Sequence, residues 1–216
     1  MNWWKPENFE QKMANLHIRA ELIKTVRRHF DGCGFMEVET PILQVCPTVD
    51  THIHGFKTDL MGVDLKVKSE LYLHSSPEFE MKKLLVAGMP KIYQICKAFR
   101  NGEGSKLHRP EFTIIEWYRA DTDYNAMMDD CEELLQSCAQ SLSITHYRHK
   151  DAICDPFRAW QKLSVAQAFS TYAGIDLDEC LDDIELFQVA IQEPCLQLGV
   201  GLVGALMRGA GAGQQQ

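Results

Sequence analysis

Several features are missing from this sequence of 216 residues, and each absence excludes a class of protein. No apolar run approaches the roughly 20 residues that span a bilayer, and residues 1–10 are mostly polar. We therefore expect no membrane span and no signal peptide. The 8 cysteines include no CxxC pair and stand mostly among apolar residues. This pattern predicts reduced, buried thiols in a cytoplasmic protein, without the ligand spacing of a zinc site.

Positive charge is also scarce, because the net charge is −8. This balance argues against a non-specific nucleic-acid binder, although a local basic patch stays compatible with it. His52 and His54 would share one face of a predicted strand over residues 51–60, but no third ligand stands near them. We therefore predict no metal site. The apolar content of 45% is that of a globular protein with one sizeable core, or one domain plus a fragment.

Two apolar runs, residues 92–99 and 112–118, flank a polar segment that contains Gly102 and Gly104. This arrangement predicts two strands joined by a longer hairpin loop. Charged and polar side chains gather at the loop and its edges: Arg100, Asn101, Glu103, Lys106, His108 and Arg109. Because a guanidinium at a strand end can hold an anionic oxygen with two N–H groups, the loop suggests a polyphosphate ligand. An edge hairpin with a solvated basic loop is the alternative.

The second of these strands has two unlike faces. With a period of two, one face carries Phe112, Ile114, Glu116 and Tyr118. A face devoted to the core would not need the carboxylate of Glu116, because an unpaired buried charge is costly.

Elsewhere the pattern predicts helices over residues 16–30, 123–142, 163–172 and 182–191, and strands over 35–39 and 65–74. A further helix follows Ser76, with Ser76 as N-cap, Pro77 at its first position and Glu78 near its positive end. Either these residues only begin a helix, or Glu78 also points into a pocket. In the helix over 123–142, the acidic residues are expected on the solvated face: Asp129, Asp130, Glu132 and Glu133. Residues 143–158 are expected to be irregular.

Three of these segments resemble one family, the class II aminoacyl-tRNA synthetases. Residues 30–41 (FDGCGFMEVETP) look like motif 1, and residues 99–118 look like motif 2. Ser76, Pro77 and Glu78 resemble the amino-acid-selecting segment of the lysine branch, and the chain is most similar to the elongation factor P–lysine ligase group within it. The resemblance implies an α+β fold: an antiparallel sheet of the class II synthetase type, flanked by helices.

The resemblance also implies roles for single residues. Arg100 would hold the α-phosphate of ATP and act as the catalytic residue, and Phe112 would stack on adenine. Asn101, Glu103, His108 and Arg109 would complete the ATP site. The substrate lysine would be received by Ser76, Pro77, Glu78, Glu116 and Tyr118. Because relatives that select aspartate have a glutamine in place of Glu78, this carboxylate indicates a cationic substrate.

From the resemblance we expect ATP-dependent activation of lysine or β-lysine to an aminoacyl-adenylate, followed by transfer to a lysine side chain of elongation factor P. Too few residues precede motif 1 for an anticodon-binding domain, and the acidic balance gives no reason to expect tRNA. Lysyl-tRNA synthetase activity is therefore the alternative. A homodimer is also expected.

The sequence departs from the family at motif 3, whose acidic magnesium ligands and Gly-x-Asp-Arg segment have no counterpart here. We expect residues 1–192 to form a class II catalytic core that carries motifs 1 and 2 and is incomplete at its C-terminal side. Residues 193–216 are expected to be a poorly ordered, glycine-rich tail of a truncated or frame-disrupted product. Mg²⁺ is expected from the family, with its usual ligands missing. A remnant that binds ATP and lysine without turnover is a second alternative.

Overall fold

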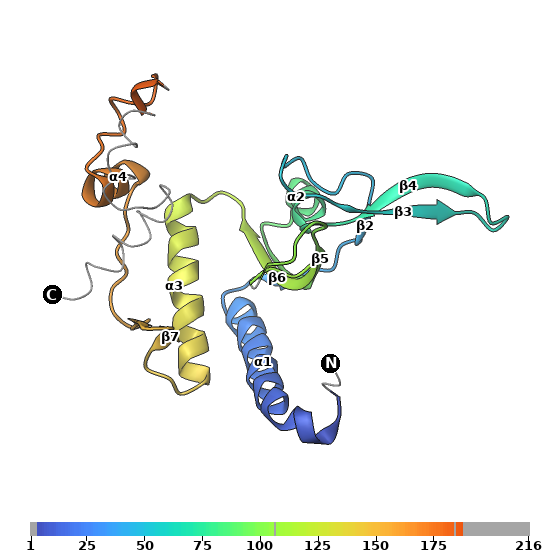
Figure 1. Ribbon diagram of the computed structural model, residues 1–216, viewed down its shortest axis with the longest axis horizontal. Helices are drawn as coiled ribbons and strands as arrows, with labels where there is room; N and C mark the ends of the chain where they lie inside the picture. The colour runs from blue at the N-terminus through green and yellow to red at the C-terminus, as the bar shows by residue number, and fades with distance from the viewer. Residues whose placement is uncertain (1–3, 106, 184, 188–216) are drawn as a thin grey trace. The chain divides into compact units, whose positions relative to one another are not determined.

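The computed structural model describes residues 4–105, 107–183 and 185–187, and the chain divides into two compact units, residues 1–144 and 145–216 (Figure 1). The first unit contains α1 (Pro6–Gly32), β1 (Met36–Glu37), β2 (Leu43–Gln44), β3 (Phe56–Met61), β4 (Val67–Leu73), α2 (Glu78–Val86), β5 (Lys91–Phe99), β6 (Glu111–Arg119) and α3 (Tyr124–Ser141). The second unit contains β7 (Tyr147–His149), β8 (Ala152–Cys154) and α4 (Val165–Ala173). No helix in the described part of the chain is long and apolar enough to span a bilayer.

The predicted hairpin is the centre of the first unit. β5 and β6 pair antiparallel over nine residues each, from Lys91 opposite Arg119 to Phe99 opposite Glu111. β1 adds a short parallel strand on the other edge of β5. The expected α+β class, with antiparallel sheets flanked by helices, is confirmed. The strand predicted over residues 35–39 shrinks to the two residues of β1.

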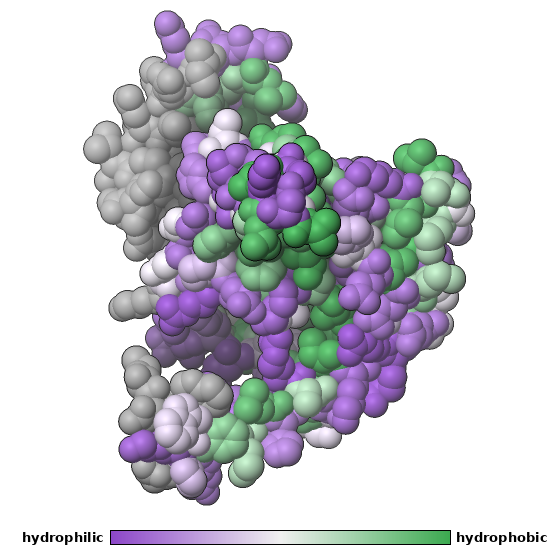
Figure 2. All heavy atoms as spheres, turned by 90° about the vertical axis from the view of Figure 1, so that its right-hand side faces the viewer, coloured by the Kyte–Doolittle hydropathy of each residue, from purple (hydrophilic) through white to green (hydrophobic). Residues whose placement is uncertain are grey.

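A second sheet has the order β2-β4-β3, and it confirms the two strands that were expected on either side of residue 62. The β3–β4 hairpin is thinly covered, and its exposed apolar side chains are Leu60, Met61, Val63, Leu65 and Val67. Figure 2 views the molecule from the side toward which this hairpin projects, and hydrophobic and hydrophilic surface alternate there. The hairpin therefore adds little to the hydrophobic core.

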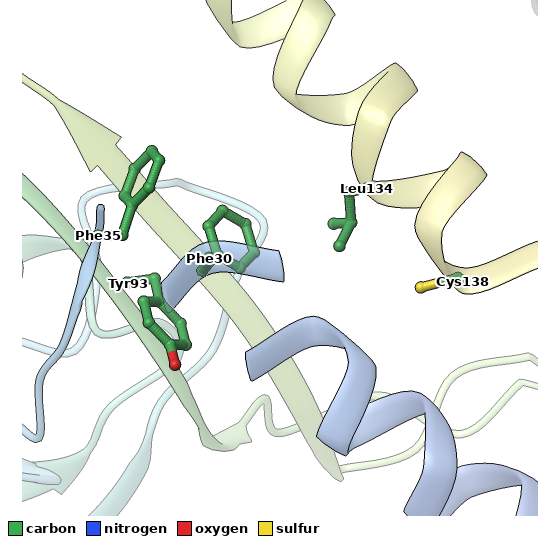
Figure 3. Close-up of a cluster of buried hydrophobic side chains, with 5 residues drawn as sticks. All are labelled: Phe30, Phe35, Tyr93, Leu134 and Cys138. Carbon is green, nitrogen blue, oxygen red and sulfur yellow. The ribbon is translucent and has the colours of Figure 1, made fainter. Parts of the chain in front are cut away.

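That core lies where α1 and α3 meet the β5–β6 sheet. Phe30 of α1 is fully buried, and its ring stacks on Tyr93 at 4.9 Å between centroids and meets Phe35 edge-on at 5.1 Å. Leu134 and Cys138 of α3 complete the cluster (Figure 3). Ile115 and Trp117 pack against it, so the face of β6 opposite Glu116 faces the core, as its period of two predicts.

The first helix begins earlier than the sequence predicts. α1 starts at Pro6, which suits a first helical turn because its missing N–H would have no partner there. The ten residues that precede the predicted helix, residues 6–15, are therefore also helical. The helix ends as expected near Gly34, which takes the left-handed conformation with φ +78°.

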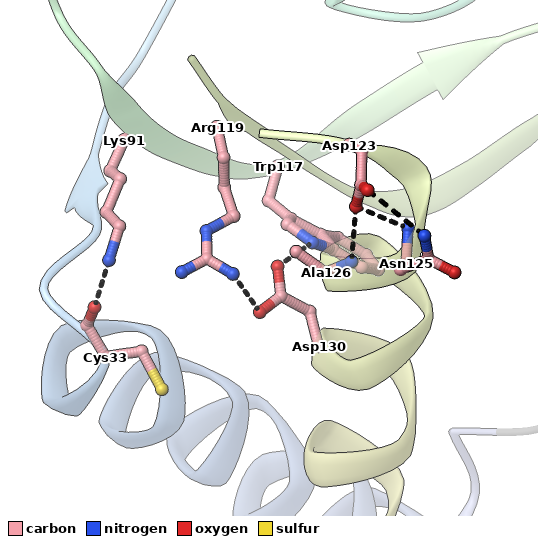
Figure 4. A network of polar contacts seen from close by, with 8 residues as sticks. All are labelled: Cys33, Lys91, Trp117, Arg119, Asp123, Asn125, Ala126 and Asp130. Atoms are coloured by element: carbon pink, nitrogen blue, oxygen red, sulfur yellow. Dashed lines mark hydrogen bonds and ion pairs between the residues drawn. The ribbon is translucent and has the colours of Figure 1, made fainter. Parts of the chain in front are cut away.

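One prediction for α3 is wrong. Asp130, expected on the solvated face, is only 7% exposed. It accepts hydrogen bonds from the Arg119 guanidinium at 3.0 Å and from the Trp117 indole at 3.2 Å (Figure 4). Because β6 supplies these two donors, the helix can bury the Asp130 carboxylate, which the helical pattern placed on the solvated face. Leu135 of the same helix is 40% exposed.

In the second unit, β7 and β8 form a small antiparallel hairpin where irregular chain was expected. α4 confirms the predicted short helix, with a capping box between Ser164 and Gln167. Residues 185–187 are helical, and half of the helix predicted over 182–191 lies outside the described residues. The predicted boundary after residue 192 and the tail over 193–216 lie outside them entirely.

The seven described cysteines are free thiols, as expected for reduced cysteines. Their predicted burial is only partly right. Cys138 and Cys180 are buried, whereas Cys46 and Cys154 are exposed.

Candidate active site

A pocket of about 240 Å³ opens on the side of the sheet opposite the core. It is formed by the start of α2, the end of β5 and the segment that precedes β3. The residues that line it are Pro47, Thr48, Asp50, Ile53, Ser75, Ser76, Glu78, Phe79, Arg100 and Glu116. Four residues that were predicted from the sequence therefore meet in one cavity, although 40 positions separate Ser76 from Glu116.

The start of α2 shapes one wall of this pocket. Pro77 is the N-cap and is fully buried, so the prediction that it stands at the first helical position is off by one. The hydroxyl of Ser76 accepts a hydrogen bond from the Glu78 amide at 3.0 Å. The same hydroxyl donates to a carboxylate oxygen of Glu116 at 2.5 Å. Ser76 therefore connects the beginning of the helix to the middle of β6.

Glu116 is held by hydroxyl groups on both carboxylate oxygens. Oε1 accepts from Ser76, and Oε2 accepts from the Tyr118 hydroxyl at 3.0 Å. Burial, and then the nearby charge of Glu116, raise the pKa of Tyr118 well above its usual value, so the phenol stays a donor. The carboxylate of Glu116 is thus held in a fixed position in the wall of the pocket, where it acts as a hydrogen-bond acceptor.

Glu78 also contributes to the pocket wall. Its carboxylate pairs with Lys82 one turn further along α2, and both side chains are about half exposed. Such an exposed pair one helical turn apart contributes roughly 0.3–0.5 kcal/mol. Lys82 can therefore be exchanged at little cost for another cation that enters the pocket.

Arg100 brings positive charge to the same cavity. It follows β5 directly, and its Nε donates to the carbonyl oxygen of Ser75 at 3.3 Å. Its guanidinium lies 5.2 Å from the centre of the Phe112 ring. Among the described residues no carboxylate forms an ion pair with Arg100, so the remaining N–H groups can bind an anion.

The loop between β5 and β6 holds the other residues that were predicted for ATP. Asn101, Glu103, His108 and Arg109 are not among the residues that line the pocket. The Asn101 amide donates to the carbonyl oxygen of His54 at 2.7 Å, which ties the beginning of the loop to the segment before β3. Nδ1 of His108 lies 2.8 Å from the Ser105 hydroxyl.

Gly102 takes the left-handed conformation with φ +76°, where a side chain is strained.

Sequence reasoning missed one wall of the pocket. Pro47, Thr48, Asp50 and Ile53 come from a segment without regular structure, and no spacing or periodicity marked them. Ser75 was also missed, although its hydroxyl donates to the Pro47 carbonyl oxygen at 2.7 Å and so joins this segment to the start of α2.

The pocket does not offer Mg²⁺ a ready set of oxygen ligands. Three carboxylates line the pocket, those of Asp50, Glu78 and Glu116, but their oxygens do not all lie within 4.8 Å of one another. The described residues contain one group of three potential metal ligands, and its members are not among those that line the pocket. The residues present therefore do not fit the magnesium ion that the family would use, and no step below depends on it.

Comparisons with known proteins agree with this geometry. The family model of the class II tRNA synthetases for aspartate, lysine and asparagine (D, K and N) matches residues 7–196. An elongation factor P–(R)-β-lysine ligase of Photobacterium profundum is 42% identical over 172 residues, which are 80% of this chain and 47% of that protein. The ligase of the same name from Edwardsiella ictaluri is 36% identical over 84% of this chain and 55% of its own length.

The corresponding ligase of Vibrio cholerae is 40% identical over 69% of this chain and 45% of its own length. The chain thus spans about half the length of these relatives. The motif 2 hairpin and the Ser76–Glu78 segment lie within the matched residues, and the structure brings both to one pocket. With this agreement between sequence and geometry, the chain belongs to the class II tRNA synthetase family that includes the aspartate, lysine and asparagine enzymes.

Proposed function

We propose that this chain activates lysine or β-lysine with ATP and transfers the activated amino acid to a lysine side chain of elongation factor P. One observation carries the proposal: the carboxylate of Glu78 and the guanidinium of Arg100 line the same small pocket. An amino acid with a cationic side chain presents an ammonium group and a carboxylate, and this pocket has a counter-charge for each.

The amino-acid end of the site would use the start of α2. Glu78 would pair with the side-chain ammonium of the substrate and release Lys82, whose half-exposed pair is weak. Glu116, fixed by Ser76 and Tyr118, would accept from an amino group of the substrate. Buried Pro77 would keep the first turn of α2 in place.

ATP would bind at the end of the β5–β6 hairpin. Phe112 would stack on the adenine ring, and Asn101, Glu103, His108 and Arg109 would line the nucleotide from the loop. Because Arg100 lies over the Phe112 ring, it is close enough to reach a phosphate of a nucleotide that is stacked there.

Activation would proceed by attack of a carboxylate oxygen of the substrate on the α-phosphorus. The new oxygen–phosphorus bond forms as the bond to the leaving pyrophosphate breaks, and Arg100 stabilises the negative charge that builds on the α-phosphate. In the second step the acceptor amine attacks the carbonyl carbon of the adenylate. An amide forms, AMP leaves and the amine gives up a proton to water. Positioning and charge stabilisation supply the catalysis, without a covalent enzyme intermediate.

The acceptor follows from the relatives, which are named as elongation factor P–(R)-β-lysine ligases. A homodimer in the cytoplasm is part of the same proposal. Transfer to tRNA, as in a lysyl-tRNA synthetase, is the competing outcome, and binding without turnover is another.

Exchange of radiolabelled pyrophosphate into ATP tests the activation step. We expect exchange that depends on lysine or β-lysine and that falls about 100- to 1,000-fold in Arg100→Ala. The matched control is Arg28→Ala, which removes an exposed guanidinium of α1 that pairs with Glu21 and Thr25, away from the pocket lining. Its exchange should match that of the unaltered chain.

Calorimetry with ATP separates the alternatives. ATP binding without exchange would leave a binding protein and overturn the proposed activity. If exchange occurs, mass spectrometry of elongation factor P and acid precipitation of tRNA identify the acceptor. Charged tRNA with unmodified elongation factor P would overturn the proposed acceptor.

A further inference from the structure

A second group of reactive side chains lies on the other side of the sheet, between α1 and α3. His29 and Cys33 come from the end of α1, and Glu133 comes from the middle of α3. One potential ligand atom from each lies within 4.8 Å of the other two. The proposed reaction uses none of these three residues. Figure 4 shows Cys33 at the end of α1, where its carbonyl oxygen accepts a hydrogen bond from Lys91.

The donor set favours one class of metal. An imidazole nitrogen, a thiolate and a carboxylate oxygen are the three ligand types that Zn²⁺ takes in proteins. The thiolate and the carboxylate together carry two negative charges, which balance a divalent cation. The C-terminal end of α1 adds the partial negative charge of the helix dipole.

The surroundings prepare these side chains for a metal. The Ser137 hydroxyl lies 3.2 Å from Nδ1 of His29 and can orient the ring, as hydrogen-bond partners do for metal-binding histidines. His29 and Cys33 are half-buried and Glu133 is exposed, so an ion can enter from solvent.

The site needs only a small adjustment. Zinc bonds of about 2.0–2.3 Å at tetrahedral angles place ligand atoms roughly 3.3–3.8 Å apart. The observed spread of up to 4.8 Å closes by about 1 Å, and the exposed side chain of Glu133 can rotate by that much.

We propose that His29, Cys33 and Glu133 form a binding site for Zn²⁺ or a similar borderline-soft divalent metal, with water as the fourth ligand. Binding releases the Cys33 thiol proton to solvent, and the metal joins α1 to α3 beside the Phe30 cluster. Its role is to stabilise this packing, because a ligand that binds only the folded chain raises the free energy of unfolding.

Cobalt titration of the full chain, stripped of metal by a chelator, tests the site. We expect one equivalent of Co²⁺ to give a thiolate-to-cobalt charge-transfer band that Zn²⁺ abolishes by displacement. Cys33→Ser should lose the band, whereas the matched variant Cys131→Ser on α3 should keep it. A band that persists in Cys33→Ser, or the absence of binding to the folded chain, overturns the proposal.

A second pair of variants avoids any effect on the core. Glu133 and Glu132 are neighbours on α3, and Glu133 is exposed. Glu133→Gln should weaken Zn²⁺ binding at least about 10-fold, while Glu132→Gln should leave it unchanged. Zn²⁺ should also raise the melting temperature of the unaltered chain but not that of Cys33→Ser. Equal affinity in Glu133→Gln and Glu132→Gln overturns the carboxylate as a ligand.

Discussion

The two faces of the β5–β6 hairpin carry alternate residues of the same strands, yet they meet different surroundings. On the face toward α1 and α3, Tyr93 and Trp117 pack against Phe30, and the charge of Asp130 is matched by Arg119. On the face toward α2, Glu116 lines an open pocket with Glu78 and Arg100. One face pairs the charge of Asp130 with Arg119 within the chain, whereas the other brings charges of both signs to a pocket.

The two faces show that a buried carboxylate can serve in two different ways. A carboxylate that is paired and hydrogen-bonded on every side fixes the packing of one helix on a sheet. A carboxylate that is held by hydroxyls at the edge of a cavity still has room for a cationic ligand. We therefore expect substitutions on the α3 face to change stability, and substitutions on the α2 face to change binding.

The largest effect is expected for Asp130→Ala. It leaves Arg119 without its carboxylate and Trp117 without an acceptor, in a place where Asp130 is only 7% exposed. Loss of one partner of a buried pair costs about 3 kcal/mol in the free energy of unfolding. Urea denaturation measures this loss. Affinity for lysine in the folded fraction should stay unchanged.

Glu132→Ala is the matched control, because Glu132 lies on the same helix and accepts a hydrogen bond from its neighbour Gln136 at 3.3 Å. Its cost should be below about 0.5 kcal/mol. If the two variants lose the same stability, the hydrogen bonds of Asp130 do not stabilise the packing of α3 on the sheet in the way proposed.

The next effect is expected for Glu78→Gln on the opposite face. An amide cannot supply the charge for an ammonium group, so lysine affinity should fall about 10- to 100-fold, as for the loss of a charged hydrogen bond. Stability should change by less than about 0.5 kcal/mol, because only the half-exposed pair with Lys82 is lost. Isothermal titration calorimetry and urea denaturation give the two values.

Glu80→Gln is the control for this binding test. Glu80 lies on the same helix and pairs with Lys83, but it does not line the pocket. Unchanged lysine affinity in Glu78→Gln, or an equal loss in Glu80→Gln, would contradict the assigned role of Glu78.

The smallest effect concerns the pH dependence of stability. Burial raises the pKa of Cys96, on the pocket-side face of β5, to about 11. Between its usual pKa near 9 and this value, the folded chain holds a proton that the unfolded chain has lost, so stability falls as pH rises. The slope for one proton is at most about 1.4 kcal/mol per pH unit, and it is lower here because Cys96 is half-buried.

Cys96→Ala should therefore flatten the fall in unfolding free energy between about pH 9 and pH 11. Cys46→Ala, which removes an exposed thiol, should leave the slope unchanged. Denaturation curves at a series of pH values compare the variants. An unchanged slope in Cys96→Ala would show that this thiol titrates alike in the folded and unfolded chains.

Much of the hairpin could be predicted from sequence because its signals are local. A period of two, a polar glycine-bearing loop and a row of aromatic residues define β5, β6 and the two faces of β6. The beginning of α2 could also be predicted, to within one position, from Ser76 and Pro77. The hydrogen bond between Ser76 and Glu116 could not be predicted, because no local rule connects residues 40 positions apart.

The failures have the same cause. The helical pattern of α3 predicts that Asp130 faces solvent. Its burial is favourable because Arg119 and Trp117 of β6 donate hydrogen bonds to its carboxylate. The segment that contains Pro47 and Asp50 has no periodicity, so its place in the pocket wall follows from contacts such as that between Ser75 and Pro47.

The sequence by itself determined the family, the hairpin and the residue types that a cationic amino acid and a phosphate require. The tertiary structure decided which of these residues share a pocket, that Glu116 is held by two hydroxyls, and that His29, Cys33 and Glu133 converge between two helices. The physical reason is distance along the chain. Strand period and helix caps act over a few residues, whereas the partner of a charge is chosen by packing between elements that lie far apart in sequence.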